Sequence, residues 1–299
     1  MLKIFKLVYA FFKVFFLLKK ESISVRFIEI NEHLKKNESD RVVPKKIWMF
    51  WDGDDLPQIV KICLESIYKH CSDYEINLLN SVNVKKYIDL PELSQDVLVA
   101  QKADLIRLEL LAAYGGIWID ASIFLNENFD WIFEKFKKQD AFLFFSDECT
   151  VNLEKPITEN WFIVAPENSK FICAWRDEFK KCITSSDPKK FYNNFLCEKE
   201  LIQNLTHTEY LLCYISAIVC LHKQSYNILY ASSADVGHYY NYKLKWDGYA
   251  LAISLLIRNK EKISKPYLLK ITSEMRRPLN FFLRYNIFNR KSLIMSDHE

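Results

Sequence analysis

A helix-forming run that ends at two consecutive glycines and leads straight into an apolar strand constrains this chain more than any other feature. The run extends over residues 95–114, and Gly115 and Gly116 follow it. Glycine adopts the left-handed backbone geometry that ends a helix at no steric cost. The next residues, Ile117 to Ile119, are apolar enough for a buried strand, and Asp120 follows directly. Helix, tight turn and buried strand in this order predict an α/β fold.

Other segments repeat this alternation of strands and helices. Residues 42–51 and 74–79 are predicted as strands, and a helix is predicted between them over residues 56–70. A strand, a helix and a second strand in this order predict parallel pairing. Further strands are predicted over 141–145 and 161–165, a short helix starting over 82–87, and longer helices over 171–183, 198–205 and 209–223. We therefore expect a mostly parallel, Rossmann-like sheet with flanking helices within one domain over residues 42–299.

Composition excludes several classes of protein. Half of the 299 residues are hydrophobic, so the chain can bury a large core. It contains five glycines, and none belongs to a dinucleotide-binding or P-loop motif. The eight cysteines lack the spacing of a zinc site or a disulfide framework, which predicts reduced thiols. No nucleic-acid reading motif accompanies the net charge of +3, so we expect no nucleic-acid partner.

Basic residues gather at both ends of the chain. Residues 1–20 contain five lysines and no acidic residue. The C-terminal region 258–291 contains ten lysines or arginines against two glutamates, so the middle of the chain is acidic. Basic ends of this kind suit contact with an anionic lipid surface or with phosphorylated ligands.

Residues 1–20 combine bulky apolar side chains with lysines along one side of a helix. Lys6 and Lys13 interrupt the apolar run, and a lysine at the centre of a spanning helix costs about 2.5 to 3.5 kcal/mol. Three interpretations remain: a basic amphipathic helix in the membrane interface, a signal peptide, and a helix packed on its own domain. We favour the first, with lysines reaching lipid headgroups. Residues 21–41 are predicted to form a helical connector.

Three charged residues of the central block can carry chemistry. Asp104 and Arg107 lie three positions apart on the predicted helix and share a face. Such a pair either grips a polyol and a diphosphate or is a plain surface ion pair. Asp120 follows a buried strand at its carboxyl end, where open α/β sheets place ligands. Its carboxylate either binds a divalent cation on a diphosphate or caps the next helix.

The block from Asp104 to Ser122 resembles the Asp-x-Asp region of the glycosyltransferases of family thirty-two, and more closely their capsular polysaccharide synthesis branch. The resemblance rests on Asp104, on Arg107 and on the motif Tyr114-Gly115-Gly116-Ile117-Trp118-Ile119-Asp120. Residues 44–53 are also similar to the first strand of that family, with its Pro-Lys-x-Ile-Trp pattern. The resemblance covers about residues 42–130.

The resemblance implies a GT-A-type nucleotide-sugar-binding fold and a glycosyltransferase activity. The enzyme would move a sugar, with retention, from a nucleotide-sugar donor such as a UDP-sugar. The acceptor would be a growing capsular or other surface polysaccharide, or a lipid-linked oligosaccharide. With the basic N-terminal segment, this predicts a peripheral protein on the cytoplasmic face of the bacterial cell membrane. Two alternatives stay open: a scaffold subunit of a polysaccharide assembly complex, and a secreted, toxin-like protein glycosyltransferase.

The resemblance also implies roles for single residues. In the family, the residues matching Asp104 and Arg107 contact the donor sugar and ribose, and the one matching Asp120 binds Mn²⁺ or Mg²⁺ with the diphosphate. Ser122 stands at the second acidic position of Asp-x-Asp, where its uncharged hydroxyl is a weaker ligand. We predict a divalent cation at Asp120 and Ser122. His238 is either a further ligand or a hydrogen-bonded structural residue.

Several other side chains are candidates for the same site. Lys270, with Arg276 and Arg277, would either stabilise a leaving nucleoside diphosphate or belong to a basic, membrane-facing tail. Trp48 and Trp51 would stack on the base or sugar of the donor, although one tryptophan of such a strand is usually core. On the acceptor side, the remaining candidates are His207 and Glu209.

Overall fold

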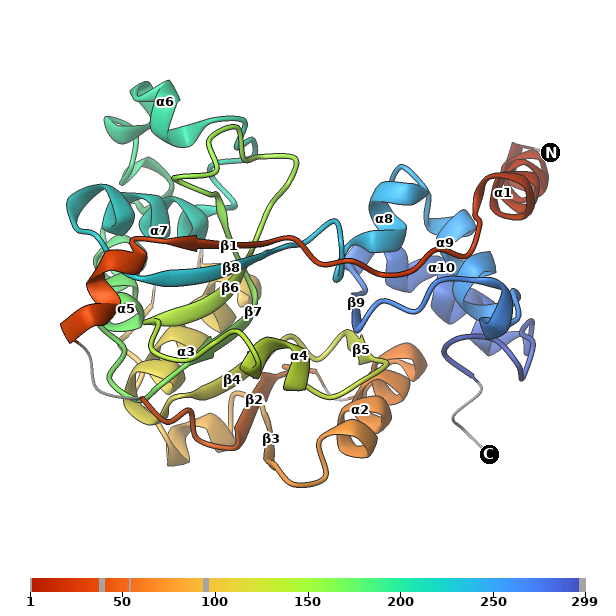
Figure 1. Ribbon diagram of the computed structural model, residues 1–299, viewed down its shortest axis with the longest axis horizontal. Coiled ribbons are helices and arrows are strands. Elements are labelled where there is room, and N and C mark those ends of the chain that lie inside the picture. Colours follow the sequence, from red (N-terminus) through yellow and green to blue (C-terminus); the bar gives the residue numbers. More distant parts are fainter. Residues whose placement is uncertain (1, 38–40, 54, 94–96, 296–299) are drawn as a thin grey trace.

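The computed structural model describes residues 2–37, 41–53, 55–93 and 97–295, and within them a seven-stranded sheet forms the centre of the molecule (Figure 1). Its strands stand in the order β1-β8-β6-β7-β4-β2-β3. Their bounds are β1 (Phe27–Ile30), β2 (Lys46–Phe50), β3 (Glu75–Leu79), β4 (Gly116–Ile119), β6 (Ala141–Phe145), β7 (Thr158–Ala165) and β8 (Ile228–Ser232). A small second sheet pairs β5 (Ile123–Leu125) with β9 (Leu268–Lys270).

The central sheet mixes parallel and antiparallel pairs. Strand β2 runs parallel to both β3 and β4, and β6 runs parallel to β8. Strand β7 is antiparallel to both β4 and β6, and β1 is antiparallel to β8. The predicted helix between β2 and β3 allows their parallel pairing, because a crossover must carry the chain back along the sheet. The predicted α/β fold class, a central sheet flanked by helices, is confirmed.

Several helices follow the predicted segments with shifted ends, and those over residues 130–133, 239–243, 248–256 and 273–284 were not predicted. The helices are α1 (Leu2–Leu17), α2 (Gln58–His70), α3 (Val99–Tyr114), α4 (Asp130–Phe133), α5 (Lys170–Ile183), α6 (Lys199–Ile202), α7 (Leu212–Lys223), α8 (Tyr239–Lys243), α9 (Gly248–Leu256) and α10 (Ser273–Arg284). The helix predicted over 198–205 shortens to the single turn of α6, and the one predicted over 82–87 is a 3-10 turn at Asn83–Lys86. Figure 1 shows α1, α9 and α10 together at one end of the molecule.

Two hydrophobic clusters, one on each face of the sheet, form the core. In β2, Ile47 and Met49 join the cluster that includes α2 and α9. Trp48 and Phe50 join the cluster that includes α3, α5 and α7. The sides alternate because successive side chains of a strand point to opposite faces. Burial on both faces explains why the strand segments are almost continuously apolar.

The prediction of a helical connector over residues 21–41 is wrong for the described residues. This segment contains β1, which pairs with β8 in register from Phe27 opposite Ala231 to Ile30 opposite Ile228. A 3-10 helix, Glu32–Asn37, follows β1. Residues 38–40 lie outside the described residues. The segment therefore belongs to the central sheet.

Helix α1 packs on the domain through a narrow inner face. Ala10, Val14 and Leu18 are buried there. The Lys13 ammonium donates a hydrogen bond to the carbonyl oxygen of Leu244 at 2.6 Å, so this lysine faces the protein and does not reach outward as expected for a lipid contact. The inner face thus matches the interpretation of a helix packed on its own domain.

The outer face of α1 is apolar and exposed. The exposed large hydrophobic side chains of this helix are Phe5, Leu7, Val8, Tyr9, Phe11, Phe12, Phe15 and Phe16. Within the described residues, no helix has the length and apolar character that crossing a bilayer requires.

Candidate active site

A cavity of about 390 Å³ opens at the carboxyl end of β4, between α3, β7 and the C-terminal segments. It brings together charged side chains that lie far apart in the sequence. The predicted site residues that line it are Trp51, Asp104, Arg107, Asp120, Ser122, His238, Lys270 and Arg276. The position is the one expected for a ligand site in an open α/β sheet.

The glycine pair after α3 determines where β4 begins. Gly115 and Gly116 have φ angles of 60° and 98°, which side-chain-bearing residues rarely adopt. A Cβ atom on Gly116 would lie 2.5 Å from the carbonyl oxygen of Lys46, so only glycine lets β4 start this close to β2. The pair thereby directs the end of β4, and Asp120, to the edge of the sheet.

Asp120 occupies a tight turn that joins β4 to β5. Its amide donates to the carbonyl oxygen of Trp161 at 2.9 Å, and its own carbonyl oxygen accepts from the Ile123 amide at 3.0 Å. The next element is a strand and not a helix, so the alternative role of a helix cap is wrong. The turn leaves the carboxylate directed into the cavity.

The Asp120 carboxylate lies among hydrogen-bond donors and cations. It forms an ion pair with Lys270, accepts from the Trp118 indole at 3.0 Å, and lies 3.4 Å from the Arg107 guanidinium. Burial acts to raise the pKa of Asp120, but the charges of Lys270 and Arg107 outweigh it and lower the pKa. Asp120 is therefore ionised at neutral pH.

Asp104 and Arg107 form a buried pair one helical turn apart. They are 3.0 Å apart, with side chains 13% and 5% exposed, so the interpretation as a surface ion pair is wrong. Asn160 fixes the pair from β7: its amide donates to Asp104 at 3.0 Å, and its carbonyl oxygen accepts from Arg107. Burial raises the pKa of Asp104 to about 6, although Arg107 lowers it.

Arg276 of α10 closes the cavity from the opposite side. Its guanidinium donates to the Ser122 hydroxyl at 3.4 Å and lies over the Trp51 ring, 5.3 Å from its centre. Burial lowers the pKa of Arg276. Lys270 and Arg276 thus face the cavity, so the alternative of a basic tail turned to a membrane does not describe these two residues. Arg277, the next residue, lines a separate groove.

His238 is hydrogen-bonded on both ring nitrogens. Its Nε2 lies 3.4 Å from the Glu159 carboxylate, and its Nδ1 lies 2.8 Å from the Asn241 amide nitrogen. Glu159 also accepts from the Trp161 indole. Burial acts to raise the pKa of Glu159, but His238 outweighs it and lowers the pKa. This geometry matches the structural alternative for His238.

Of the three predicted ligands of a divalent cation, Asp120 is the one carboxylate, and it already pairs with Lys270. Ser122 faces Arg276 and His238 faces Glu159. In the part of the chain that the structure describes, no three His, Cys, Asp or Glu side chains are grouped to hold a metal ion. These residues do not fit a metal centre held by the protein alone, and the cation at Asp120 stays a prediction.

Trp48 does not reach the cavity. Its side chain is fully buried, and its indole donates to the carbonyl oxygen of Gly115 at 2.9 Å, so stacking on a donor is wrong for this residue. Trp48 lies in the middle of β2 and is enclosed by the core, whereas Trp51, just beyond the end of β2, lines the cavity. His207 and Glu209 are exposed and not among the lining residues; their neighbour Tyr210 is.

Two polar partners were missed by the sequence analysis. The Trp118 indole donates a hydrogen bond to Asp120. The sequence could have indicated this contact, because residues two positions apart on a strand share a face. Asn160 holds both members of the Asp104 and Arg107 pair from a distant strand. No local pattern in the sequence reveals that contact.

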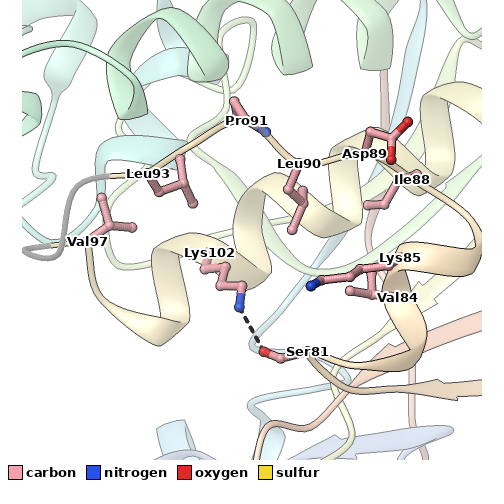
Figure 2. A pocket seen from close by; sticks show the side chains of 10 residues that line it. All are labelled: Ser81, Val84, Lys85, Ile88, Asp89, Leu90, Pro91, Leu93, Val97 and Lys102. Atoms are coloured by element: carbon pink, nitrogen blue, oxygen red, sulfur yellow. Dashed lines mark hydrogen bonds between the residues drawn. The ribbon is translucent and has the colours of Figure 1, made fainter.

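A second cavity, of about 520 Å³, lies beside the first turns of α3. Figure 2 shows Lys102 donating to the Ser81 hydroxyl, 2.7 Å away, with Lys85 and Leu90 close by. Ser81 in turn donates to Asp52, at 2.6 Å, in the loop after β2. The first part of α3 contributes to both cavities: Ala103 and Asp104 line the first one, and Lys102 lines the second.

The sequence was compared with known protein families. Residues 12–232 match the family described as capsular polysaccharide synthesis protein. The chain belongs to this family. Asp104, Arg107 and Asp120 lie inside the matched part. Lys270 and Arg276 lie beyond it, so in this capsular polysaccharide synthesis protein a segment outside the match contributes two cations to the cavity.

Individual relatives are more distant. The chain is 29% identical over 158 residues to the O-glycosyltransferase braB of Annulohypoxylon truncatum, a match that covers 46% of this chain and 37% of that protein. Among solved structures, it is similar to the glycosyltransferase GlyE of Streptococcus pneumoniae TIGR4, with 12% identity over 86% of this chain and 63% of that one and a TM-score of 0.42. It is also similar to the PaToxG glycosyltransferase, with 15% identity over 64% and 92% of the two chains and a TM-score of 0.37.

Proposed function

We propose that this member of the capsular polysaccharide synthesis family is a glycosyltransferase that moves a sugar from a nucleotide-sugar donor to a surface polysaccharide. One observation carries the proposal: Asp120, at the end of a buried strand, shares a cavity with the cations of Arg107, Lys270 and Arg276. The name of the relative from Annulohypoxylon truncatum supports the same activity. A UDP-sugar is the donor that we propose.

The cations suit the chemistry of a nucleoside diphosphate leaving group. In the transfer, the bond between the anomeric carbon and the diphosphate oxygen breaks, the acceptor hydroxyl forms a new bond to that carbon, and its proton passes to the released diphosphate. Negative charge develops on the leaving diphosphate, and fixed cations in a partly dry cavity stabilise it. Lys270 and Arg276 suit this role because both line the cavity, where they contact Asp120 and Ser122.

The Asp104 and Arg107 pair suits the donor sugar and ribose. Asn160 holds the pair rigidly, and a carboxylate beside a guanidinium offers both an acceptor and donors to neighbouring hydroxyls. We propose that the pair orients the donor and that the anomeric configuration is retained. The GT-A-type fold implied by the resemblance belongs to the same proposal.

We also propose that the enzyme works as a peripheral protein on the cytoplasmic face of a bacterial membrane. The outward aromatic face of α1 supports this, because tryptophan, tyrosine and phenylalanine side chains favour the membrane interface. Lys6, Lys19 and Lys20 are exposed on and just after the same helix and suit anionic headgroups.

The activity is tested with purified protein and a panel of nucleotide sugars, by measuring release of the nucleoside diphosphate. We expect turnover with one donor class, and a loss of at least about 100-fold for Asp120→Asn and for Lys270→Met. The matched control is Asp177→Asn, an exposed aspartate on α5, which should retain full turnover. Full turnover by Asp120→Asn contradicts the assigned role.

The predicted divalent cation has a direct test of its own. Turnover is measured after treatment with a chelator and again after Mn²⁺ is restored. Loss and recovery support a cation at Asp120. Unchanged turnover assigns the neutralisation of the diphosphate to Lys270 and Arg276.

A further inference from the structure

An apolar groove lies next to the reaction cavity and is not explained by donor binding. It measures about 630 Å³ and is formed by α1, α9 and α10. Leu7 comes from α1, Tyr249 from α9, and Met275, Pro278 and Phe281 from α10. Its volume lies within the range of about 300 to 1,000 Å³ that is typical of small-molecule sites.

The shape and lining of the groove suit a flexible hydrocarbon chain. Phe281 is 50% exposed, so the wall is accessible from solvent, while Met275 is buried beneath it. A Cβ atom on Gly248 would lie 3.0 Å from the Pro278 ring and 3.4 Å from the Met275 sulfur, so this glycine keeps α9 and α10 close. Methionine adapts its side chain to irregular apolar ligands.

The groove and the reaction cavity are neighbouring spaces that share the lining residue Trp246. This side chain is 41% exposed, lines both spaces, and packs on His238 with ring centres 5.2 Å apart. Two consecutive arginines of α10 line the two spaces: Arg276 lines the cavity and Arg277 lines the groove. Glu274 also lines the groove.

We propose that this groove binds the hydrocarbon chain of a lipid-phosphate-linked sugar acceptor. The phosphate lies beside Arg277, and the acceptor sugar passes Trp246 to reach the donor in the cavity. The inference rests on the proposed transferase function and adds to it a binding site for the hydrocarbon part of the acceptor. Three facts support it: the apolar lining of the groove, the tryptophan that it shares with the cavity, and an arginine in its wall.

The binding test uses calorimetry with alkyl phosphates below their critical micelle concentrations. We expect dodecyl phosphate to bind at least about tenfold tighter than butyl phosphate or inorganic phosphate, since each buried methylene contributes up to about fourfold. Phe281→Glu should weaken dodecyl phosphate binding at least about tenfold. The control Phe191→Glu alters a similarly exposed phenylalanine far from the groove and should bind as the unchanged protein does. Circular dichroism checks that both variants are folded.

Three results overturn the groove assignment. The first is an affinity independent of alkyl chain length, which leaves only a phosphate contact. The second is equal affinity of Phe281→Glu and Phe191→Glu. The third is a Phe281→Glu protein that loses binding to anionic vesicles but keeps its affinity for dodecyl phosphate, which would make this face a contact with the bilayer alone.

A turnover test separates failure of the groove from failure of the transferase function. The same acceptor sugar is offered as a short water-soluble glycoside and as a dodecyl-phosphate conjugate. Phe281→Glu should raise KM for the conjugate at least about tenfold relative to KM for the glycoside, and Phe191→Glu should leave the ratio unchanged. Absence of turnover with every donor and acceptor contradicts the transferase function, whereas turnover with an unaltered ratio contradicts the groove.

Discussion

Asp104 keeps its carboxyl group in surroundings that disfavour its charge. Because burial raises its pKa to about 6, the group becomes neutral as pH falls through that value, and its ion pair with Arg107 weakens. We expect kcat/KM for the donor to decline on the acid side of about pH 6. Asp104→Asn should have low activity, and that activity should not decline further at acid pH. A pH profile of donor turnover measures both proteins. An unchanged decline in the variant would assign it to another group.

The same carboxyl group makes the stability of the fold depend on pH. Its folded-state pKa of about 6 lies above the ordinary value of 3.8, so the folded protein binds the proton more tightly than the unfolded chain. The contribution of Asp104 is therefore fully present below about pH 4 and is lost as pH rises through about 6. In urea unfolding from pH 4 to 7, Asp104→Asn should gain stability relative to the unchanged protein as pH rises. A constant difference would contradict the shifted pKa.

The candidate site could be predicted from sequence where its residues are close together in the chain. Asp104, Arg107 and Asp120 fall within one helix, turn and strand, so local spacing revealed them. Lys270, 150 positions after its partner Asp120, had weaker support, because no local pattern records such a contact. Trp48 was misplaced because the apolar pattern of residues 46–51 does not show at which point along the strand the cavity begins.

At the scale of elements, the junction of α3 and β4 depends on backbone geometry that only glycine adopts freely. Gly116→Ala adds a Cβ 2.5 Å from the Lys46 carbonyl oxygen at a φ of 98°. We expect a loss of about 2 to 4 kcal/mol in the free energy of unfolding, measured with urea. Gly53→Ala is the matched control, because that glycine has an ordinary φ and its Cβ would approach only the Trp51 ring, at 3.3 Å. Equal losses in both would contradict this account.

The sequence predicted most elements up to α7 but missed β1, β5 and α4, and it predicted none of the elements after α7. Strands β2 and β4 are continuous apolar runs bounded by turn residues, and α3 ends at glycines, so local signals sufficed. The four residues of β1 stand in a polar, lysine-rich neighbourhood and gain their strand structure by pairing with β8, some two hundred positions later. Long-range pairing of this kind leaves little trace in a short segment.

At the scale of the whole molecule, α1, α9 and α10 gather at one end (Figure 1). The aromatic side chains of α1 are exposed there. If this face contacts a membrane, the double variant Phe12→Ser and Phe16→Ser should bind anionic vesicles at least about tenfold more weakly, because each phenylalanine contributes about 1.5 to 3 kcal/mol when buried. Sedimentation with vesicles measures the effect. Both side chains are exposed, so the unfolding midpoint should not change.

The control is Phe191→Ser, which removes an exposed phenylalanine from a different part of the molecule. High salt should weaken vesicle binding by the unchanged protein, the double variant and the control. The reason is that salt screens the attraction between the lysines near α1 and the anionic headgroups. Equal vesicle binding by the double variant and this control would leave the aromatic face without the proposed role.

The pairing of β5 with β9 has a consequence for how the protein is made. During translation, the glycine pair and Asp120 are synthesised long before Lys270 and Arg276. Lys270 reaches Asp120 because β9 pairs with β5. A nascent chain that stops short of β9 would hold an acidic pocket with no countercharge from the C-terminal segment. Competence for transfer would therefore arise only in the last steps of translation, so truncated products would be inert towards cellular nucleotide sugars.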